Sequence, residues 1–273
     1  MHEGVIGIDL GGTKLLMISS DREIRSATGP DFSPAQLESE LKAFVTRDSL
    51  RPSRIGIAVP GLVDVDGRVV ECDVLPAFRG WCASEALADL GCELCIVNDV
   101  KAALAEEMHD APADFTGGVI MAGTAIGAAF MVDGRPLRGA TGFAGELGYA
   151  PIFLGSRISR LDELAGGACI ATKLGVTAEK LLDLAKAADP AALEAIQQAG
   201  AALGIGIATV VNLLNPSRLA VGGGALELPG YWQAALASAE RNSLPALWRA
   251  CALGKVRTGF KVVALGALRC ASA

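Results

Sequence analysis

The segment Gly4-Val-Ile-Gly-Ile-Asp-Leu-Gly-Gly-Thr-Lys14 decides the fold. It predicts an apolar strand that carries Asp9 near its exit and turns at once on Gly11-Gly12, and residues 15–20 (LLMISS) predict a return strand. Such a hairpin exposes backbone N–H groups with nothing to block the approach of a phosphate. Asp9 is then placed to hold a magnesium ion through water. The alternative is an ordinary tight hairpin without a ligand.

This turn differs from two better-known phosphate loops. A P-loop requires Gly-x4-Gly-Lys-Ser/Thr before a helix, whereas Gly12 is followed by Thr13-Lys14 and a predicted strand. A dinucleotide-binding loop requires Gly-x-Gly-x-x-Gly at the start of a helix, and neither that spacing nor a helix is present.

Composition and charge exclude several classes of protein. The chain has 273 residues, of which 51% are hydrophobic, and a net charge of −6, which argues against a non-specific grip on nucleic acid or on an anionic membrane. The long uncharged stretch 195–217 contains Gln, Asn and Pro, so we interpret it as a buried helix and a turn rather than a membrane span. Seven scattered cysteines without a secretion signal indicate reduced thiols in a cytoplasmic protein, and the pair Cys92 and Cys95 is interpreted as core.

The strand–turn–strand device recurs in the second part of the chain. Residues 118–122 predict a strand, Gly123-Thr-Ala-Ile-Gly127 a turn, and residues 128–132 a return strand. We therefore predict two α/β domains, residues 1–112 and 113–273, each with one phosphate hairpin and with a cleft between them. The C-terminal helix is expected to pack back on the first domain.

Two further segments end predicted strands with functional residue types. Asn98-Asp99 follows one strand and precedes a helix, where these residues can cap the helix. Gly222-Gly223-Gly224 follows the strand 218–221, where bare backbone lets an adenine ring lie close; the alternative is a flexible turn.

These segments, in this order, resemble the ROK family of bacterial sugar kinases and sugar-responsive repressors over nearly the whole chain. The resemblance rests on residues 9–14 (DLGGTK), 57–61 (IAVPG), 80–81 (GW), 98–99 (ND), 123–127 (GTAIG), 138–148 (RGATGFAGELG) and 215–224 (NPSRLAVGGG).

The family implies a two-domain actin-like (ribonuclease H-like) kinase fold that binds ATP and Mg²⁺, with Asp99 in the position of the general base. The predicted ATP and phosphate contacts are Asp9, Gly11, Gly12, Thr13, Lys14, Gly123, Thr124, Gly127, Gly222, Gly223 and Gly224. The predicted sugar contacts are Gly61, Asn98, Asp99, Glu146, Tyr149 and Asp162.

The chain departs from the family pattern at its zinc and sugar positions. Tyr149 stands where the family usually has a histidine, and residues 150–162 lack the cysteine cluster, so we expect no structural zinc. Asp162 takes the place of a sugar-binding glutamate, with Glu163 as the second candidate, and Ala77 replaces an asparagine near the sugar. Ala125 replaces a glycine of the second turn, which is tolerable if its φ is negative. Because the predicted sugar contacts differ from the glucose-type pattern, we do not predict glucose as the substrate.

The function expected from this resemblance is ATP-dependent phosphorylation of a hydroxyl of a hexose or N-acylhexosamine, by a homodimer. The alternative is a non-catalytic sensor of sugar or nucleotide with the same fold. The DNA-binding repressors of the family carry a helix-turn-helix before the first strand, whereas here the hairpin is reached by residue 11. Gly12→Val is expected to weaken ATP binding with little change in melting temperature.

Overall fold

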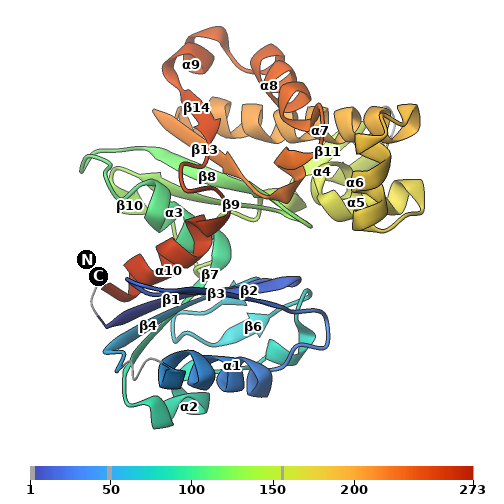
Figure 1. Cartoon of the computed structure of the whole chain (residues 1–273). Coiled ribbons are helices and arrows are strands. Elements are labelled where there is room, and N and C mark those ends of the chain that lie inside the picture. The colour runs from blue at the N-terminus through green and yellow to red at the C-terminus, as the bar shows by residue number, and fades with distance from the viewer. Residues whose placement is uncertain (1–3, 48–50, 155–156, 273) are drawn as a thin grey trace. The chain divides into compact units, whose positions relative to one another are not determined.

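The computed structural model describes residues 4–47, 51–154 and 157–272, which form two compact units (Figure 1). Unit 1 comprises Met1–Asp110, Arg138–Ala144 and Phe260–Ala273, and unit 2 comprises Ala111–Leu137 and Gly145–Gly259. By their contacts, residues 138–144 and the C-terminal residues 260–273 belong to unit 1, although both follow residue 113 in the chain.

Unit 1 is built on a five-stranded sheet of order β3-β2-β1-β4-β7. The pairs β3–β2 and β2–β1 are antiparallel, and β1–β4 and β4–β7 are parallel. The strands are β1 (Val5–Leu10), β2 (Lys14–Ile18), β3 (Glu23–Ala27), β4 (Arg54–Val59) and β7 (Glu93–Asn98). The hairpin predicted from the opening segment is therefore the β1–β2 pair.

Unit 2 repeats this plan with the order β10-β9-β8-β13-β14. Here β10–β9 and β9–β8 are antiparallel, and β8–β13 and β13–β14 are parallel. The strands are β8 (Gly117–Ala122), β9 (Ile126–Val132), β10 (Arg135–Pro136), β13 (Arg218–Gly222) and β14 (Ala252–Lys255). The second predicted hairpin, β8–β9, therefore holds the same place in its sheet as β1–β2 holds in the first.

Helices and small hairpins complete each unit. Those of unit 1 are α1 (Pro34–Arg47), β5 (Leu62–Val63), β6 (Val69–Glu71), α2 (Ala83–Ala86), α3 (Asp99–Glu107) and α10 (Val262–Ser272). Those of unit 2 are β11 (Pro151–Leu154), β12 (Arg157–Arg160), α4 (Asp162–Ala165), α5 (Gly167–Leu174), α6 (Ala178–Lys186), α7 (Pro190–Leu214), α8 (Tyr231–Asn242) and α9 (Pro245–Ala250). Short 3₁₀ turns include η1 (Pro76–Phe78), η3 (Leu147–Tyr149) and η4 (Gly224–Glu227).

Local sequence signals explain where several helices begin. Ser33 and Gln36 form a reciprocal capping box at the start of α1: the Gln36 side chain accepts from Ser33 N at 2.9 Å and Ser33 Oγ accepts from Gln36 N at 3.4 Å. The start of α7 combines an Asp189 cap, whose Oδ1 accepts from Ala192 N at 2.9 Å, with Pro190 in the first turn. Both helix starts thus depend on residues that lie within three positions of each other in the sequence.

Helix α10 packs against β1 and β4 of unit 1 across a surface made flat by glycine. Gly7 and Gly56 are register partners on these neighbouring strands. A Cβ at Gly7 would lie 2.2 Å from Ala264 O, and a Cβ at Gly56 would lie 1.9 Å from Ala267 O. The two glycines therefore let the backbone of α10 approach the sheet directly.

The long apolar segment of unit 2 is α7, which packs along α8. By length and composition α7 is the one described helix that passes the test for a membrane span, and 61% of its most apolar window is buried inside the protein. The interpretation of this segment as a buried helix followed by a turn is confirmed, because the helix ends at Leu214 and Asn215 turns the chain with a φ of 46°.

The close approach of α10 gives a stability test. Gly56→Ala should destabilise unit 1 by about 3 kcal/mol, since the added methyl group must displace the α10 backbone. Gly29→Ala is the matched control, because nothing lies within 4 Å of its new Cβ. Urea denaturation of both variants measures the difference, and equal stabilities would show that α10 does not pack as described.

Candidate functional site

The turn between β1 and β2 leaves two consecutive backbone N–H groups without an acceptor in the described residues. Gly11 N donates to Lys14 O at 2.9 Å across the turn, and Gly11 O accepts from Thr28 Oγ1 at 2.6 Å. Within the described residues no acceptor is bonded to the N–H of Gly12 or Thr13. The N–H of Gly11 is thus used inside the hairpin, and those of Gly12 and Thr13 are the ones available to a phosphate.

The absence of a side chain at Gly12 has a second, structural reason. A Cβ there would lie 2.1 Å from Val74 Cγ1. A valine at Gly12 must therefore displace the side chain of Val74, which is 37% exposed, and the predicted small change in melting temperature of Gly12→Val stays a prediction. A variant that tests phosphate binding at this position has to make room for its new methyl group.

Asp9 is the most perturbed carboxyl group of unit 1. It is only 7% exposed, and its pKa is raised to about 7, first by burial and then by the negative charge of Asp99; Lys14 acts in the opposite direction. Asp9 lies near the end of β1 and Asp99 directly follows β7, so two strands of one sheet bring these carboxylates into electrostatic contact. A divalent cation fits this donor set, because it would offset the cost of the buried charge and the mutual repulsion.

Asn98 and Asp99 are held firmly at the end of β7. Asn98 is the cap of α3: its Oδ1 accepts from Val100 N at 3.0 Å and Lys101 N at 3.2 Å. Its Nδ2 donates to Gly61 O at 2.9 Å and Asp99 Oδ1 at 3.0 Å. These four bonds use the full hydrogen-bonding capacity of the amide.

Asn98 is therefore the residue that caps α3, and Asp99 is the first residue of the helix. A sugar bound by Asn98 would have to replace one of these four bonds, and its predicted role as a sugar contact stays a prediction. Gly61 shares in the arrangement and has no room for a side chain, because its φ is 144° and a Cβ there would lie 2.2 Å from Glu71 O.

The raised pKa of Asp9 predicts a pH-dependent stability. Between about pH 4 and 7 the folded chain keeps the proton on Asp9 and the unfolded chain has lost it, so this group's contribution to stability falls as the pH rises. Asp9→Asn should therefore be more stable than the wild type by a margin that grows from pH 4 and levels off above pH 7, reaching up to about 4 kcal/mol.

Denaturation curves at pH 4.5, 6 and 7.5 without divalent cations measure this margin. The exposed Asp31→Asn is the matched control and should show no such trend. A margin for Asp9→Asn that stays constant across these pH values would contradict the assignment.

The turn between β8 and β9 in unit 2 has the same free groups. Gly123 N donates to Ala125 O at 3.0 Å, and in the described part of the chain no acceptor is bonded to the N–H of Thr124 or Ala125, both of which are exposed. Ala125 is not among the described residues with positive φ, so the condition for its replacing a glycine is met. Gly127 lies within β9, opposite Met121.

The three glycines at residues 222–224 have different roles: the first two are required by close packing, and the third has free space beside its backbone. Gly223 has a φ of 103°, and a Cβ there would meet Ala122 O at 2.3 Å, while a Cβ at Gly222 would meet Met121 Sδ at 2.8 Å. Nothing lies within 4 Å of a Cβ built on Gly224. Backbone packing therefore explains Gly222 and Gly223, and Gly224 offers the open backbone that an adenine contact requires; that contact stays a prediction.

The predicted sugar residues of unit 2 lie on or beside η3 and α4. Tyr149 is 57% exposed, with the Arg160 guanidinium 4.8 Å from its ring centroid, and Glu146 is exposed. Asp162 accepts from Ile126 N through Oδ1 at 2.6 Å, and Glu163 pairs with Arg160 at 3.2 Å. Both carboxylates proposed in place of the family glutamate thus have partners inside unit 2.

Sequence reasoning missed two contacts that shape these turns. Lys101, in the first turn of α3, donates through Nζ to Gly142 O and so ties residues 138–144 to unit 1. Val74 covers Gly12. Neither had a signal in the local sequence, because each partner is far away along the chain.

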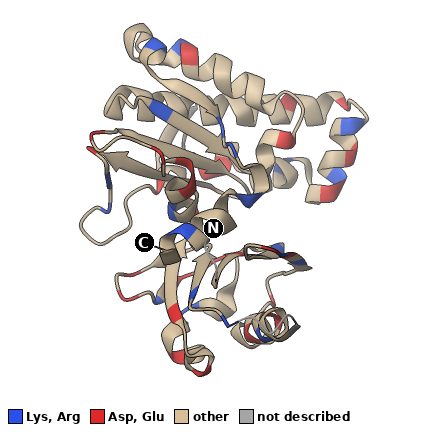
Figure 2. Cartoon of the chain, turned by 60° about the vertical axis from the view of Figure 1, so that its left-hand side comes forward, with Lys and Arg blue, Asp and Glu red and all other residues tan. Residues whose placement is uncertain are grey.

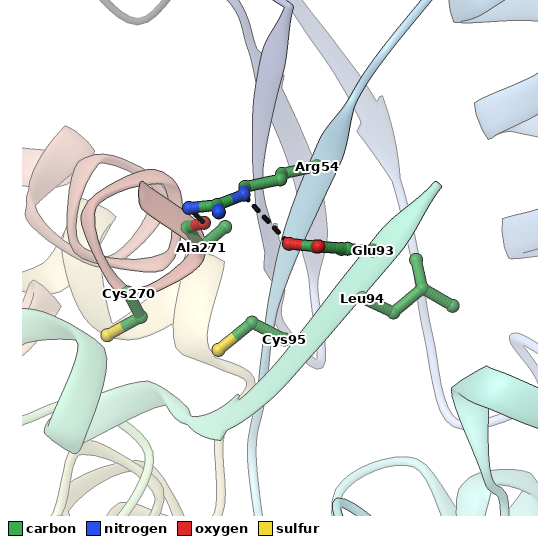
Figure 3. A pocket seen from close by; sticks show the side chains of 6 residues that line it. All are labelled: Arg54, Glu93, Leu94, Cys95, Cys270 and Ala271. Carbon is green, nitrogen blue, oxygen red and sulfur yellow. Dashed lines mark hydrogen bonds and ion pairs between the residues drawn. The ribbon is translucent and has the colours of Figure 1, made fainter. Parts of the chain in front are cut away.

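A pocket of about 250 Å³ in unit 1 lies apart from the predicted site residues. Figure 3 shows Arg54 reaching Glu93, to which it is paired at 2.8 Å, and Arg54 also donates to Ala271 O at 3.2 Å. Arg54 and Glu93 begin β4 and β7, whereas Asn98 ends β7. The thiols of Cys95 and Cys270 line the pocket, and burial raises the pKa of both, to about 11 for Cys270. This pocket offers neither an unpaired charge nor a reactive thiolate.

Charge and metal-ligand patterns do not by themselves mark a site. Figure 2 shows Lys and Arg interspersed with Asp and Glu on both units. Within the described residues no group of three or more His, Cys, Asp or Glu side chains could hold a metal ion, and all seven cysteines are free thiols. Residues 155–156 of the loop expected to lack zinc ligands lie outside the described residues, and the absence of zinc stays a prediction.

The chain belongs to the ROK family, whose model matches residues 5–272. A ROK hexokinase from Thermus thermophilus has a TM-score of 0.78 and 28% identity, with 98% of this chain and 97% of that chain covered. An N-acetylmannosamine kinase of Citrobacter koseri is 27% identical, covering 83% of this chain and 85% of that protein. A xylose repressor of Bacillus spizizenii is 28% identical, covering 78% of this chain and 62% of that protein.

The predicted family and fold class are thus confirmed: the chain has the two-domain actin-like (ribonuclease H-like) ATPase fold of the ROK sugar kinases. Its two sheets of identical strand pattern agree with that fold.

Proposed function

We propose that this protein is an ATP-dependent sugar kinase that phosphorylates a hydroxyl of a hexose or an N-acylhexosamine, with Asp99 as the general base. Family membership and the kinases among its relatives support the reaction class. The observation that supports the proposal most is the electrostatic contact of Asp99 with Asp9, which precedes by two residues a turn with two free backbone N–H groups.

The proposed chemistry is an in-line transfer. The sugar hydroxyl oxygen attacks the γ-phosphorus of ATP, the bond from that phosphorus to the β-phosphate oxygen breaks, and the hydroxyl proton passes to Asp99. Val100 N, at 2.9 Å, and Asn98 Nδ2 both donate to Asp99 Oδ1 and fix the orientation of the carboxylate. The N–H groups of Gly12, Thr13, Thr124 and Ala125 are proposed to receive phosphate oxygens.

Magnesium, held near Asp9 through water, would supply positive charge to the phosphates. Asp9 is suited to this role because its buried carboxylate has a raised pKa that a nearby cation would lower. Lys14 begins β2 beside the turn and adds a second positive charge to the same part of unit 1.

A non-catalytic sensor of the same fold is the alternative, favoured by the similarity to a xylose repressor. A coupled assay of ADP release over hexoses and N-acylhexosamines distinguishes the two. Sugar-dependent ADP release supports the kinase, whereas binding of ATP and of a sugar without turnover supports the sensor.

The role of Asp99 is tested by Asp99→Asn. The amide keeps an oxygen that accepts from Val100 N but cannot take up the proton, and Asn98 still caps α3. We expect kcat to fall by about 10²–10⁴ with the affinity for ATP almost unchanged, as measured by steady-state kinetics and by titration with ATP. Near-normal turnover would leave Asp99 without a catalytic role.

The first phosphate turn is tested by the double variant Gly12→Ala with Val74→Ala. Removing the Val74 side chain makes room for the new methyl group, so that only the approach of a phosphate is obstructed. We expect the affinity for Mg–ATP to fall about tenfold or more relative to Val74→Ala alone, with similar melting temperatures. An unchanged affinity for Mg–ATP would mean that the β1–β2 turn does not bind phosphate.

A further inference from the structure

The second phosphate turn is held from outside by the start of two helices. Gly167 N donates to Gly123 O at 2.8 Å, and Ala168 N donates to Thr124 O at 3.3 Å. Asp162 Oδ1 accepts from Ile126 N at 2.6 Å. Two carbonyl groups of the turn are thereby directed toward α5, and the first residue of β9 is fixed to α4.

The site of this carboxylate is shaped to hold it. A Cβ at Gly148 would lie 2.2 Å from Asp162 Oδ1 and 2.4 Å from Ile126 O, so a side chain at residue 148 would occupy the space in which the bond is made. Gly148 belongs to η3, which carries Tyr149, while Ile126 is 3% exposed within the core of unit 2. Three separate segments, η3, β9 and α4, therefore meet at one partly buried hydrogen bond.

This arrangement matters for the nucleotide because of what lies one residue before Ile126. The N–H groups of Thr124 and Ala125 are those without an acceptor in the described part of unit 2. Their direction depends on the conformation of the turn, which is bounded at one end by Ala122 and at the other by Ile126. A bond that fixes Ile126 N therefore fixes the groups proposed to receive phosphate oxygens.

We propose that Asp162 is a positioning residue for the nucleotide, acting through the Ile126 amide on the β8–β9 turn, and that it does not bind the sugar. The inference rests on the proposed function, in which this turn binds phosphate. It also assigns Gly148 the role of leaving space for the Asp162 carboxylate. The position that the family resemblance gives to the sugar is thus used for ATP in this chain.

Two substitutions of Asp162 separate nucleotide positioning from sugar binding. Asp162→Asn retains an oxygen that accepts from Ile126 N, so it should keep the dissociation constant for Mg–AMPPNP within about twofold of the wild type. Asp162→Glu retains the charge, but its longer side chain does not fit between Gly148 and Ile126 N. It should weaken Mg–AMPPNP about tenfold while leaving the KM for the sugar unchanged.

The experiment measures Mg–AMPPNP binding by calorimetry, and KM for ATP and for the sugar by kinetics, on the full chain. Asp162→Ala, which should resemble Asp162→Glu, is a third variant, and the exposed Asp183→Ala on α6 is the control. Melting temperatures identify variants that do not fold. If Asp162→Ala does not fold, the comparison of Asp162→Asn with Asp162→Glu still shows whether Asp162 positions the nucleotide or binds the sugar.

A sugar KM that rises in Asp162→Asn and recovers in Asp162→Glu, with unchanged nucleotide binding, would overturn the inference and make Asp162 a sugar ligand. An equal loss of nucleotide affinity in Asp162→Asn and Asp162→Glu would overturn it as well, because the acceptor is kept in one of them. A wild type that binds Mg–AMPPNP but turns over no sugar would reject the proposed kinase activity, while the binding data would still decide the role of Asp162.

Discussion

The proposed function depends on four backbone N–H groups at the turns β1–β2 and β8–β9 that have no acceptor in the described structure. In an ordinary hairpin, water satisfies such N–H groups of the loop residues; here phosphate oxygens are proposed to take the place of that water. In both turns the first N–H closes the turn from Gly11 or Gly123, and the next two are left over. The duplicated sheet pattern places the two turns at equivalent positions of their units.

The residues around each turn are arranged to keep it in shape. In unit 1, Thr28 holds Gly11 O and Val74 covers Gly12. In unit 2, the first turn of α5 takes the carbonyl groups of the turn and Asp162 takes Ile126 N. The rigidity is therefore supplied by side chains and helix ends outside the hairpins, which leaves the turns themselves bare for a ligand.

The sequence predicted well those features whose cause is local. The apolar strand before Gly11-Gly12 and the return strand after it were predicted, because each is set by residues within a few positions. The Ser33 cap of α1 and the Asp189-Pro190 start of α7 are local in the same way. The order of the motifs along the chain was sufficient to identify the family.

What the sequence could not predict depends on partners distant along the chain. The glycines of β1 and β4 are explained only by α10, more than 200 residues later, and the bond from Ile126 to Asp162 spans 36 residues. The same distance hid the crowding at Gly12, where Val74 occupies the space that a side chain would need. The full use of the Asn98 amide follows from Gly61, which approaches it from another loop.

The central claim is that both turns receive the phosphates of a nucleotide. Amide chemical shifts of the isotope-labelled protein, recorded during titration with Mg–AMPPNP, test it most directly. We predict that the resonances of Gly12, Thr13, Thr124 and Ala125 move together at one dissociation constant and that the amides around the Arg54 pocket do not. Saturable binding that leaves the resonances of either turn unmoved would contradict it.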